Sequence, residues 1–312
     1  MALPHLLTVL GNACADTAYR LTALPQPGET VIAGSVTGDL GGKGLNQAVA
    51  AARAGVVPRF IAPVGQDAIA DRIAATLQHE GIDPSGMIRR AGASDGSVIL
   101  IDRFGENAIV SSTAQAEALA FADLAPGLQL TPAHLLLLQG NLSRATTHAA
   151  VTAARAAGAT VALNAAPMRD WLGDLSPDIL IANRGEAAIL AHLSPTADPA
   201  TLLAALSPAI AVITLGADGC LLRDHGKITR IAAPTVTVQD SAGAGDVFCG
   251  TFIAEWLHTG DASAAAGLAI LAASAKVTRA GTLSAFPSAA DIDRLRQTLP
   301  KAPRTPRTLR SP

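Results

Sequence analysis

A glycine-rich segment in the C-terminal third of the chain combines an expected anion site with two acidic side chains. It reads Asp240-Ser-Ala-Gly-Ala-Gly-Asp246 and lies between an extended stretch, Thr235–Gln239, and a helical stretch from about Val247 to His258. Glycines at such a strand–loop–helix junction let the backbone approach a ligand closely. The free N–H groups at the start of the helix favour an anion. The segment therefore predicts a cradle for a phosphate group.

Asp246 has two interpretations. An aspartate in the first turn of a helix is often a cap, and the residue by itself favours neither role. However, the carboxylate adjoins the expected anion site, and Asp240 places a second carboxylate six residues earlier. An aspartate base beside a phosphate cradle is what phosphorylation of an alcohol requires. The whole segment therefore favours phosphoryl transfer to a hydroxyl over a cap.

A second glycine-rich segment, Gly41-Gly-Lys-Gly-Leu-Asn46, precedes the alanine-rich stretch that ends at Gly55. Alanine is the strongest helix former and glycine commonly ends a helix, so we predict a helix from Asn46 to Ala54. Lys43 and Asn46 are then held at a loop and a first helical turn. They could hydrogen-bond a polyhydroxylated ligand, or they could be exposed polar residues of a structural turn.

Two common nucleotide-binding motifs are absent from both segments. Gly42-Lys43 would fit the phosphate-binding P-loop, but Thr37 stands where its first glycine belongs and Gly44 follows the lysine. The dinucleotide motif fails at residues 243–250, because Phe248 replaces its third glycine. The chain is therefore neither an obvious P-loop protein nor an obvious dinucleotide oxidoreductase.

The elements that would position these segments alternate between short apolar strands and alanine-rich helices. Continuous apolar runs are expected of parallel strands buried on both faces, and the alternation predicts an α/β fold with a mostly parallel sheet. The 312 residues are enough for one large domain or two smaller ones. The expected strands are Leu6–Leu10, Leu135–Leu138, Thr160–Leu163, Ile179–Ile181 and Ala211–Leu215, with a helix at about Arg144–Ala157.

Two regions break this alternation. Thr30–Asp39 and Ser97–Ser111 have the pattern of half-exposed antiparallel strands, and Gly105-Glu106-Asn107 is a plausible hairpin turn inside the second region. Our hypothesis is that lid strands from about 13–40 and 96–112 form a small sheet that stands off the main body and covers a cleft.

Composition excludes several functional classes. The formal net charge of −2 gives no case for nucleic-acid binding. The three cysteines are too few and too widely spaced to predict a disulfide framework or a zinc site. We expect no membrane span and no signal peptide, hence a cytoplasmic protein. We expect the basic residues 301–312 to form a disordered tail, with an anionic partner as the less favoured alternative.

Together, the motifs resemble those of the ribokinase family, also called the PfkB carbohydrate kinase family, and within it they are closest to the ribokinases. The similarity covers roughly residues 6–295 in order. It is carried by Gly11-Asn-Ala-Cys-Ala-Asp16, Leu24-Pro-Gln-Pro-Gly-Glu-Thr30, Gly41 to Gly55, Ala182-Asn183-Arg-Gly-Glu186, Thr214-Leu-Gly-Ala-Asp-Gly219, Asp240 to Asp246 and Val277-Thr-Arg279-Ala-Gly281.

The resemblance implies a three-layer ribokinase-like α/β fold spanning residues 1–300, with a small β lid through which such proteins often form homodimers. It implies ATP, Mg²⁺ and potentially K⁺ as cofactors, and a sugar or nucleoside as substrate. It implies that Asp246 is the base. The other implied roles are an anion hole from Ala242, Gly243, Ala244 and Gly245, sugar contacts from Asp16, Gly42, Lys43 and Asn46, and nucleotide contacts from Asn183, Thr214, Gly216 and Gly219. Mg²⁺ is implied near Glu186. K⁺ is implied near Asp240 and the backbone carbonyls around Ala242, Lys276, Arg279 and Gly281, with the side chain of Arg279 structural.

Three positions depart from the ribokinase pattern. Cys14 stands where ribokinases have an asparagine facing the sugar, and Asn141 stands where they have a glutamate that holds a sugar hydroxyl. Thiols are weak hydrogen-bonding groups, so both changes predict a substrate other than free ribose. Ala285 replaces a serine that often helps the potassium site, which weakens the expectation of K⁺ dependence.

These observations favour an ATP-dependent sugar kinase. The alternatives within the family are nucleoside kinases and other sugar kinases, such as those acting on pseudouridine, fructose or 2-keto-3-deoxygluconate. A non-catalytic ligand-binding protein on the same fold is less favoured, because both the base and the anion loop are present.

Overall fold

A nine-stranded sheet runs through the computed structural model, which describes residues 6–104 and 107–299. The strand order is β13-β12-β11-β10-β9-β8-β1-β4-β5. Seven strands are parallel and the last two form an antiparallel hairpin at one edge. The parallel strands are β1 (Leu6–Leu10), β4 (Arg59–Val64), β5 (Met87–Arg89), β8 (His134–Leu138), β9 (Thr160–Asn164), β10 (Ile179–Asn183) and β11 (Ile210–Thr214), and the hairpin is β12 (Cys220–Asp224) and β13 (Lys227–Ile231).

Buried leucines on the central strands alternate between the two faces of this sheet. In β8, Leu135 and Leu137 belong to one hydrophobic core, whereas Leu136 and Leu138 belong to the other. Successive strand side chains point to opposite faces, so a continuous apolar run supplies both cores at once. This is the parallel, doubly covered sheet that the apolar runs predicted.

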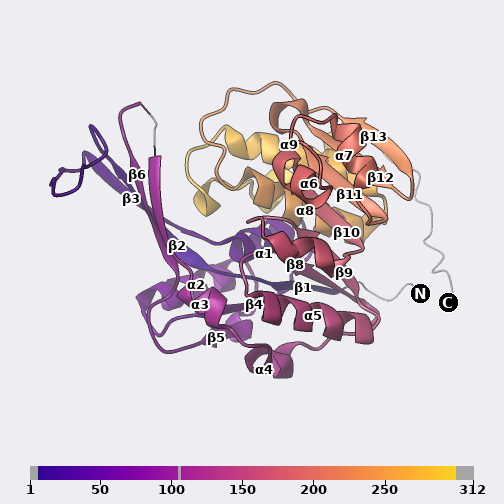
Figure 1. Cartoon of the computed structure of the whole chain (residues 1–312), viewed down its shortest axis with the longest axis horizontal. Coiled ribbons are helices and arrows are strands. Elements are labelled where there is room, and N and C mark those ends of the chain that lie inside the picture. Colours follow the sequence, from indigo (N-terminus) through magenta and orange to yellow (C-terminus); the bar gives the residue numbers. More distant parts are fainter. Residues whose placement is uncertain (1–5, 105–106, 300–312) are drawn as a thin grey trace.

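Helices cover both faces and complete the three layers (Figure 1). One core contains residues of α1 (Lys43–Arg53), α2 (Ala68–His79), α8 (Ala244–Thr259), α9 (Ala262–Val277) and α10 (Ala289–Thr298). The opposite core contains residues of α3 (Ala114–Ala118), α4 (Phe121–Leu124), α5 (Arg144–Ala156), α6 (Arg184–Leu190) and α7 (Pro199–Ala205). The expected α/β class and three-layer architecture are confirmed.

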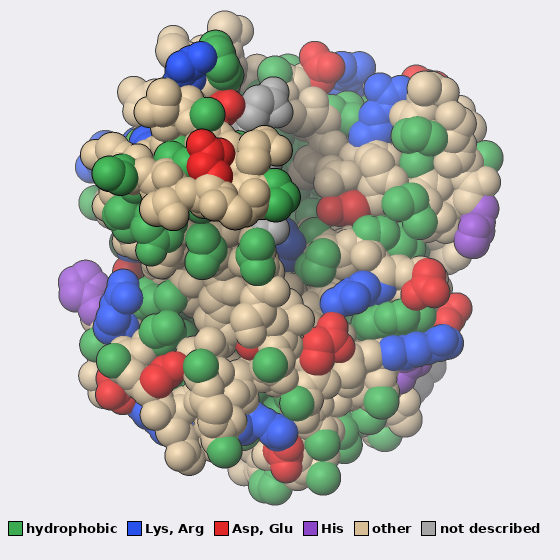
Figure 2. Space-filling model, turned by 60° about the vertical axis from the view of Figure 1, so that its left-hand side comes forward, with side chains coloured by type: hydrophobic (Ala, Val, Ile, Leu, Met, Phe, Trp, Pro, Cys, Tyr) green, Lys and Arg blue, Asp and Glu red, His purple; other side chains and the backbone are tan. Residues whose placement is uncertain are grey.

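A separate four-stranded sheet, here called the lid sheet, projects from the main body on the left of Figure 1. Its order is β3-β2-β6-β7, with β2 (Cys14–Arg20), β3 (Ser35–Gly41), β6 (Gly96–Ile101) and β7 (Asn107–Ser112). Figure 2 shows the surface hollowed between the lid sheet and the body. The two regions that broke the strand–helix alternation thus form one sheet outside the central one, as the hypothesis required.

One bound of the expected lid strands is wrong. The strand expected at Thr30–Asp39 begins only at Ser35, because Arg20 ends β2 and pairs with Ser35, so earlier residues have no partner strand. The strands of both regions pair antiparallel as expected, β3 with β2 and β6 with β7, whereas β2 and β6 join the two halves of the lid in parallel from Ala15↔Gly96 onward. These strands come from distant parts of the chain, and no local turn sets their direction. The hairpin predicted around Gly105-Glu106-Asn107 is confirmed, because β6 and β7 pair antiparallel with Ile101 opposite Asn107. Residues 105–106 of its turn and the predicted tail at 301–312 lie outside the described residues.

Helices α1 and α8 are in unusually close contact, and this contact positions the residues discussed below. A Cβ atom built on Gly250 would lie 2.4 Å from the Gln47 carbonyl oxygen and 2.7 Å from the Ala50 Cβ atom. Only a residue without a side chain lets the two backbones approach this closely.

None of the helices in the described part of the chain is long and apolar enough to cross a membrane.

We therefore expect Gly250→Val to destabilise the protein by about 1–3 kcal/mol, because the added side chain must push α8 away from α1. Thermal and urea denaturation would measure this loss. Gly267→Ala in α9 is the matched control: its nearest neighbour is the flexible end of Leu299 at 3.2 Å, and alanine favours a helix. A Gly250→Val protein as stable as the wild type would contradict the close packing.

Candidate active site

Asp246 lies in the first turn of α8 and is only 5% exposed. The helix begins at Ala244, three residues earlier than the sequence predicted, with Gly243 as its N-cap in a left-handed conformation at φ 76°. Asp246 is therefore not the helix cap. Its carboxylate instead accepts hydrogen bonds from the side-chain amides of Asn46 and Gln47, each at 2.9 Å. The carboxylate is thus held against α1.

Lys43 is on the same face of α1 as these amides. Helix α1 begins at Lys43 rather than at the expected Asn46. The side chains of Lys43 and Asn46 are therefore one helical turn apart. The ammonium of Lys43 lies 4.0 Å from the Asp246 carboxylate, and the lysine side chain is 34% exposed. A partly exposed cation therefore stands beside a buried carboxylate, where a charged ligand can reach it.

Behind Asp246 is a buried polar network that sequence reasoning missed. Gln47 is completely buried and its side-chain amide also donates to Asn164 at 3.1 Å. Its carbonyl oxygen accepts from Gln139 at 2.9 Å. These hydrogen bonds orient the amides, and the amides in turn set the direction of the carboxylate. The buried oxygens of Asn46 and Gln139 have no partner among the described residues. The available signal was a glutamine next to Asn46 in an otherwise alanine-rich helix.

The loop that precedes α8 has two kinds of backbone amide. Ala242 N–H donates to the Asp240 carboxylate at 2.8 Å, and Ala244 N–H donates to the Ser241 carbonyl at 3.2 Å. Within the described residues, the amides of Gly243 and Gly245 have no such acceptor. A Cβ on Gly245 would meet nothing within 4 Å. Two of the four predicted amides therefore shape the loop, and two are available to an anion.

The sugar-side residues predicted in β2 lie at the base of the lid sheet. The Cys14 thiol donates to the Asp16 carboxylate at 3.6 Å. Burial raises the pKa of the Asp16 carboxyl, opposed by the Ser97 hydroxyl and the Cys14 thiol. Burial, with the nearby Asp16 charge, also raises the pKa of Cys14 far above its usual range. Cys14 therefore stays a neutral thiol and cannot serve as a nucleophile at ordinary pH.

Glycines at the end of β3 keep this region open. A Cβ on Gly41 would lie 2.6 Å from the Asp16 carboxylate, and one on Gly42 would lie 2.8 Å from Ala13 Cα. Gly42 also has φ 95°, which other residues rarely adopt. These glycines let β3 turn into α1 directly beside Asp16. Lys43 and Asn46 are thereby placed on the same side as Asp16.

Asn141 follows β8, two residues after Gln139 of the buried network. Its side-chain carbonyl oxygen is buried and has no hydrogen-bond partner among the described residues. An unsatisfied buried acceptor is costly and calls for a ligand or water donor. A sugar hydroxyl would satisfy it.

A pocket of about 490 Å³ lies at the carboxyl ends of β10 and β11. Asn183, Thr214 and Gly216, which were predicted to contact a nucleotide, all line it, and sequence reasoning missed Arg184 and Arg230 on its wall. Gly219 does not line it. It has φ 87°, and a Cβ there would lie 2.0 Å from the Ile231 carbonyl oxygen, so this glycine shapes the turn that borders the pocket.

Glu186 is paired with Asn183, which lines this pocket. It forms a capping box with Asn183, in which each side chain bonds the other's backbone amide at 2.8–2.9 Å. Burial raises the pKa of the Glu186 carboxyl, and the charges of Lys43 and Asp246 act on it in opposite directions. Among the described residues there is no cluster of three or more His, Cys, Asp or Glu that could hold a metal ion. A lone carboxylate suits Mg²⁺ that arrives with substrate phosphates.

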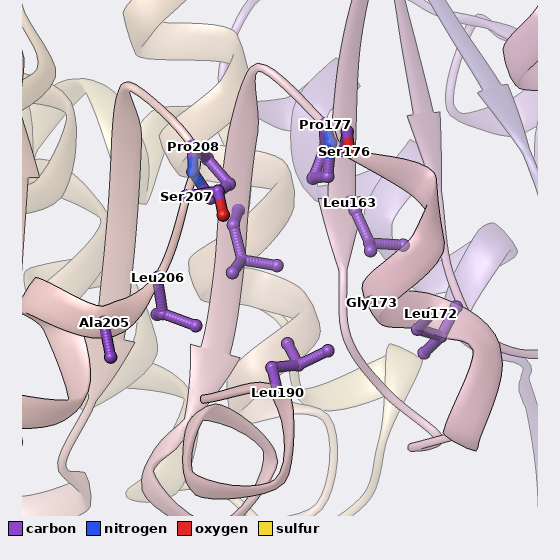
Figure 3. Close-up of a pocket in the computed structure, with 11 residues that line it drawn as sticks. Leu163, Leu172, Gly173, Ser176, Pro177, Leu190, Ala205, Leu206, Ser207 and Pro208 are labelled. Carbon is purple, nitrogen blue, oxygen red and sulfur yellow. The ribbon is translucent and has the colours of Figure 1, made fainter. Parts of the chain in front are cut away.

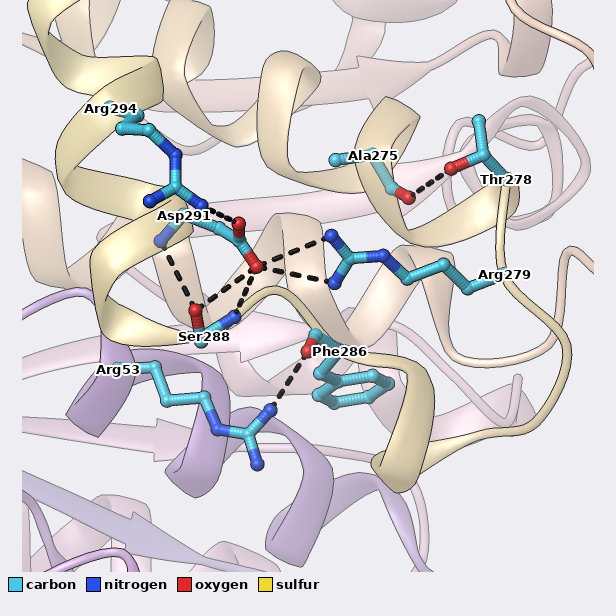
Figure 4. Close-up of polar contacts among 8 residues, drawn as sticks. All are labelled: Arg53, Ala275, Thr278, Arg279, Phe286, Ser288, Asp291 and Arg294. Atoms are coloured by element: carbon cyan, nitrogen blue, oxygen red, sulfur yellow. Dashed lines mark hydrogen bonds and ion pairs between the residues drawn. The ribbon is translucent and has the colours of Figure 1, made fainter.

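The residues predicted around the potassium site also come together. The carboxylate of Asp240 accepts from the amides of Ala242 and Gly281, at 2.8 and 3.0 Å. Lys276 donates its ammonium to the Asp240 carbonyl at 2.9 Å. The side chain of Arg279 points elsewhere and pairs with Asp291 at the start of α10 (Figure 4). From the sequence we expected the Arg279 side chain to be structural, and this contact supports that expectation.

A smaller pocket of about 60 Å³ lies away from these residues (Figure 3). Leucines and prolines dominate its wall, including Leu163, Leu190 and Pro208. It contains none of the predicted site residues and no charged side chain, so it offers no chemistry.

Curated proteins similar to this chain are sugar kinases. A ribokinase from Haemophilus influenzae is 31% identical over 292 residues, which cover 90% of this chain and 95% of that protein. A deoxyribokinase from Salmonella typhi is 29% identical over 294 residues, with the same coverage. Among solved structures, Arabidopsis thaliana ribokinase, complexed with ribose and ATP, has a TM-score of 0.85 and 24% identity over 95% of this chain and 100% of that one.

The fold and site thus define a class of protein, the ATP-dependent sugar kinases. A model described as "pfkB family carbohydrate kinase" matches residues 4–289, and the chain belongs to this family.

The contact around Asp291 predicts an acid-sensitive contribution to stability. Hydrogen bonds from the Ser288 backbone, together with Arg279, lower the pKa of the Asp291 carboxyl to about 2, against about 3.9 for an unfolded aspartate. A carboxyl whose pKa is lower in the folded protein than in the unfolded chain stabilises the folded state fully at pH values above the unfolded pKa. This stabilisation is lost as the pH falls through the folded pKa. Asp291→Asn should therefore cost on the order of 1 kcal/mol at pH 7, and the cost should shrink as pH falls below about 4 and vanish only below about pH 2.

Thermal melting of both proteins between pH 7 and the acid limit would measure this difference. Asp174→Asn is the control, because Asp174 and Arg144 form an exposed ion pair with little expected effect. A difference between wild type and Asp291→Asn that does not shrink with acid would refute the assignment.

Proposed function

We propose that this sugar kinase transfers the γ-phosphate of ATP to a sugar hydroxyl, with Asp246 as the general base. The observation that carries the proposal is the buried Asp246 carboxylate, fixed by Asn46 and Gln47 beside the amides of Gly243 and Gly245. A base and an anion cradle a few atoms apart are what in-line phosphoryl transfer to an alcohol needs.

In this mechanism Asp246 accepts the hydroxyl proton as the oxygen attacks phosphorus. Each carboxylate oxygen takes one amide hydrogen bond and keeps a lone pair for the substrate. The amides of Gly243 and Gly245 stabilise negative charge on the transferring phosphoryl oxygens. The nearby Lys43 ammonium favours the same charge. The protein therefore contributes orientation, a proton acceptor and a fixed electrostatic environment.

Asn183, Thr214 and Gly216 would contact the nucleotide in the pocket that they line, with Gly219 shaping its border. Glu186, at the start of α6, would hold Mg²⁺ through its carboxylate or a bound water. When bound, the ion would neutralise charge on the phosphates. Asp16, Gly42, Lys43 and Asn46 would contact the sugar.

The preferred sugar differs from ribose in this proposal, because Cys14 and Asn141 alter the groups that would select its hydroxyls. The Cys14 thiol already donates to Asp16, and Asn141 offers a neutral, unsatisfied carbonyl oxygen in place of a carboxylate. A site that lacks a strong acceptor gains little from the matching hydroxyl. Deoxy and keto sugars are therefore the first candidates.

We also propose that the lid sheet mediates a homodimer. Val36, Val98 and Val110 on its strands are 54%, 43% and 71% exposed. Exposed apolar side chains grouped on one sheet favour contact with another protein surface, and the family resemblance implies a second copy of the chain.

Asp246→Asn should lower kcat about 10²–10⁴-fold, because the amide cannot accept the hydroxyl proton. ADP release with ATP and a panel of sugars and nucleosides measures this effect, and melting curves check the fold. Asp174→Asn, on the exposed surface, should retain wild-type kcat. A kcat of Asp246→Asn equal to that of wild type would rule out the base, and no turnover of any panel member by wild type would rule out the kinase.

The substrate prediction uses the same panel. For wild type we expect ribose to have a kcat/KM at least about tenfold below that of the best sugar. The double variant Cys14→Asn and Asn141→Glu should shift this ratio toward ribose, since it restores a strong donor and acceptor. Ribose as the best wild-type substrate would contradict the proposal, as would an unchanged ratio in the double variant.

A further inference from the structure

Lys276 is a fully buried lysine in the last turn of α9, behind the loop that precedes α8. Its ammonium donates to the Asp240 carbonyl at 2.9 Å and lies 3.9 Å from the Asp240 carboxylate. Lysine is almost never fully buried unless its charge is paired. The side chain is therefore placed here for its charge, because an apolar residue would be cheaper to bury.

Asp240 connects this ammonium to the anion loop. One carboxylate oxygen accepts from Ala242 N–H within the loop, and the other accepts from Gly281 N–H beyond the end of α9. The neighbouring residues of that second segment, Thr282 and Ser284, donate to Asp39 at the end of β3. The loop, the segment after α9 and the lid sheet thus meet around two carboxylates.

Burial lowers the pKa of Lys276, and the charges of Asp240 and Asp39 oppose this by favouring the ammonium; of the two carboxylates, the ammonium directly contacts Asp240. The other nearby cation, Arg279, turns its guanidinium to Asp291. One internal positive charge therefore compensates the acidic groups that hold the loop in place.

The same place does not fit the potassium ion that the family resemblance led us to expect. The carbonyl oxygen of Lys276, one expected ligand, already accepts from Arg279 N–H at 3.0 Å. The carbonyl oxygen of Asp240 already receives the ammonium. A second cation here would have to share these oxygens with the existing hydrogen bonds and would be repelled by the ammonium.

We propose that the Lys276 ammonium takes the place of a monovalent cation behind the anion loop, so that this kinase works without K⁺. Lys276 is a positioning residue: it holds Asp240, and Asp240 holds the Ala242 amide and with it the loop. The effect on turnover rests on the loop's proposed role, but the replacement of the cation rests only on the contacts of Lys276.

The test compares turnover in tetramethylammonium, K⁺ and NH₄⁺ buffers of equal ionic strength. Wild type should show less than about twofold difference between them, and Lys276→Ala should lose about 100-fold in tetramethylammonium, as expected when a loop is misplaced. K⁺ or NH₄⁺ should restore much of that loss by entering the space vacated. Lys276→Met, which keeps the apolar stem, should not be restored. Lys227→Ala, at an exposed lysine of β13, is the control and should behave like wild type.

Melting temperature gives a second measurement that does not depend on activity. K⁺ should raise the melting temperature of Lys276→Ala above its value in tetramethylammonium, and should leave wild type unchanged. Strong activation or stabilisation of wild type by K⁺ would overturn the proposal, as would a Lys276→Ala protein indifferent to K⁺ in both measurements. If no sugar were phosphorylated but the melting response appeared, the cation replacement would stand and the proposed function would fail.

Discussion

The buried contact between α1 and α8 is the constraint on which the site depends. Asp246 comes from one helix and its two amide donors, Asn46 and Gln47, come from the other. Gly250 lets the backbones of these two helices approach closely. Any side chain there would separate the carboxylate from the groups that orient it. Packing of the core and orientation of the Asp246 carboxylate are therefore one property of the structure.

The parallel sheet supplies the rest of the site at the carboxyl ends of its strands. Gln139 follows β8, Asn164 ends β9, Asn183 ends β10 and Thr214 ends β11. Parallel strands bring all these ends to one edge, where ligands bind in open α/β sheets. The lid sheet closes this arrangement from the other side, since β2 carries Cys14 and Asp16. Strand direction, set by the helical crossovers, thus decides that the residues proposed to bind sugar and nucleotide lie at one edge of the sheet.

Local sequence pattern was sufficient for most of the fold. Apolar runs such as Leu135–Leu138 predicted buried strands, and the observed β8 begins one residue earlier. The alanine-rich segment before Gly55 predicted α1, although the helix begins at Lys43. Local pattern was not sufficient where a partner strand decided the outcome. Residues before Ser35 lack a partner on β2, and the parallel pairing of β2 with β6 joins segments about 80 positions apart, which no local pattern encodes.

The sequence by itself determined the residue types at the site: glycines before two helices, Asp246 beside them, and the departures at Cys14 and Asn141. These follow from local backbone requirements and ordered motifs. Only the tertiary structure decided what each polar group contacts, because the decisive partners are distant in the chain. Asn46 and Asp246 are 200 residues apart. The same holds for Lys276, expected to offer a carbonyl, whose buried ammonium proved to be the group that meets Asp240, since burial forces a charge to find its partner.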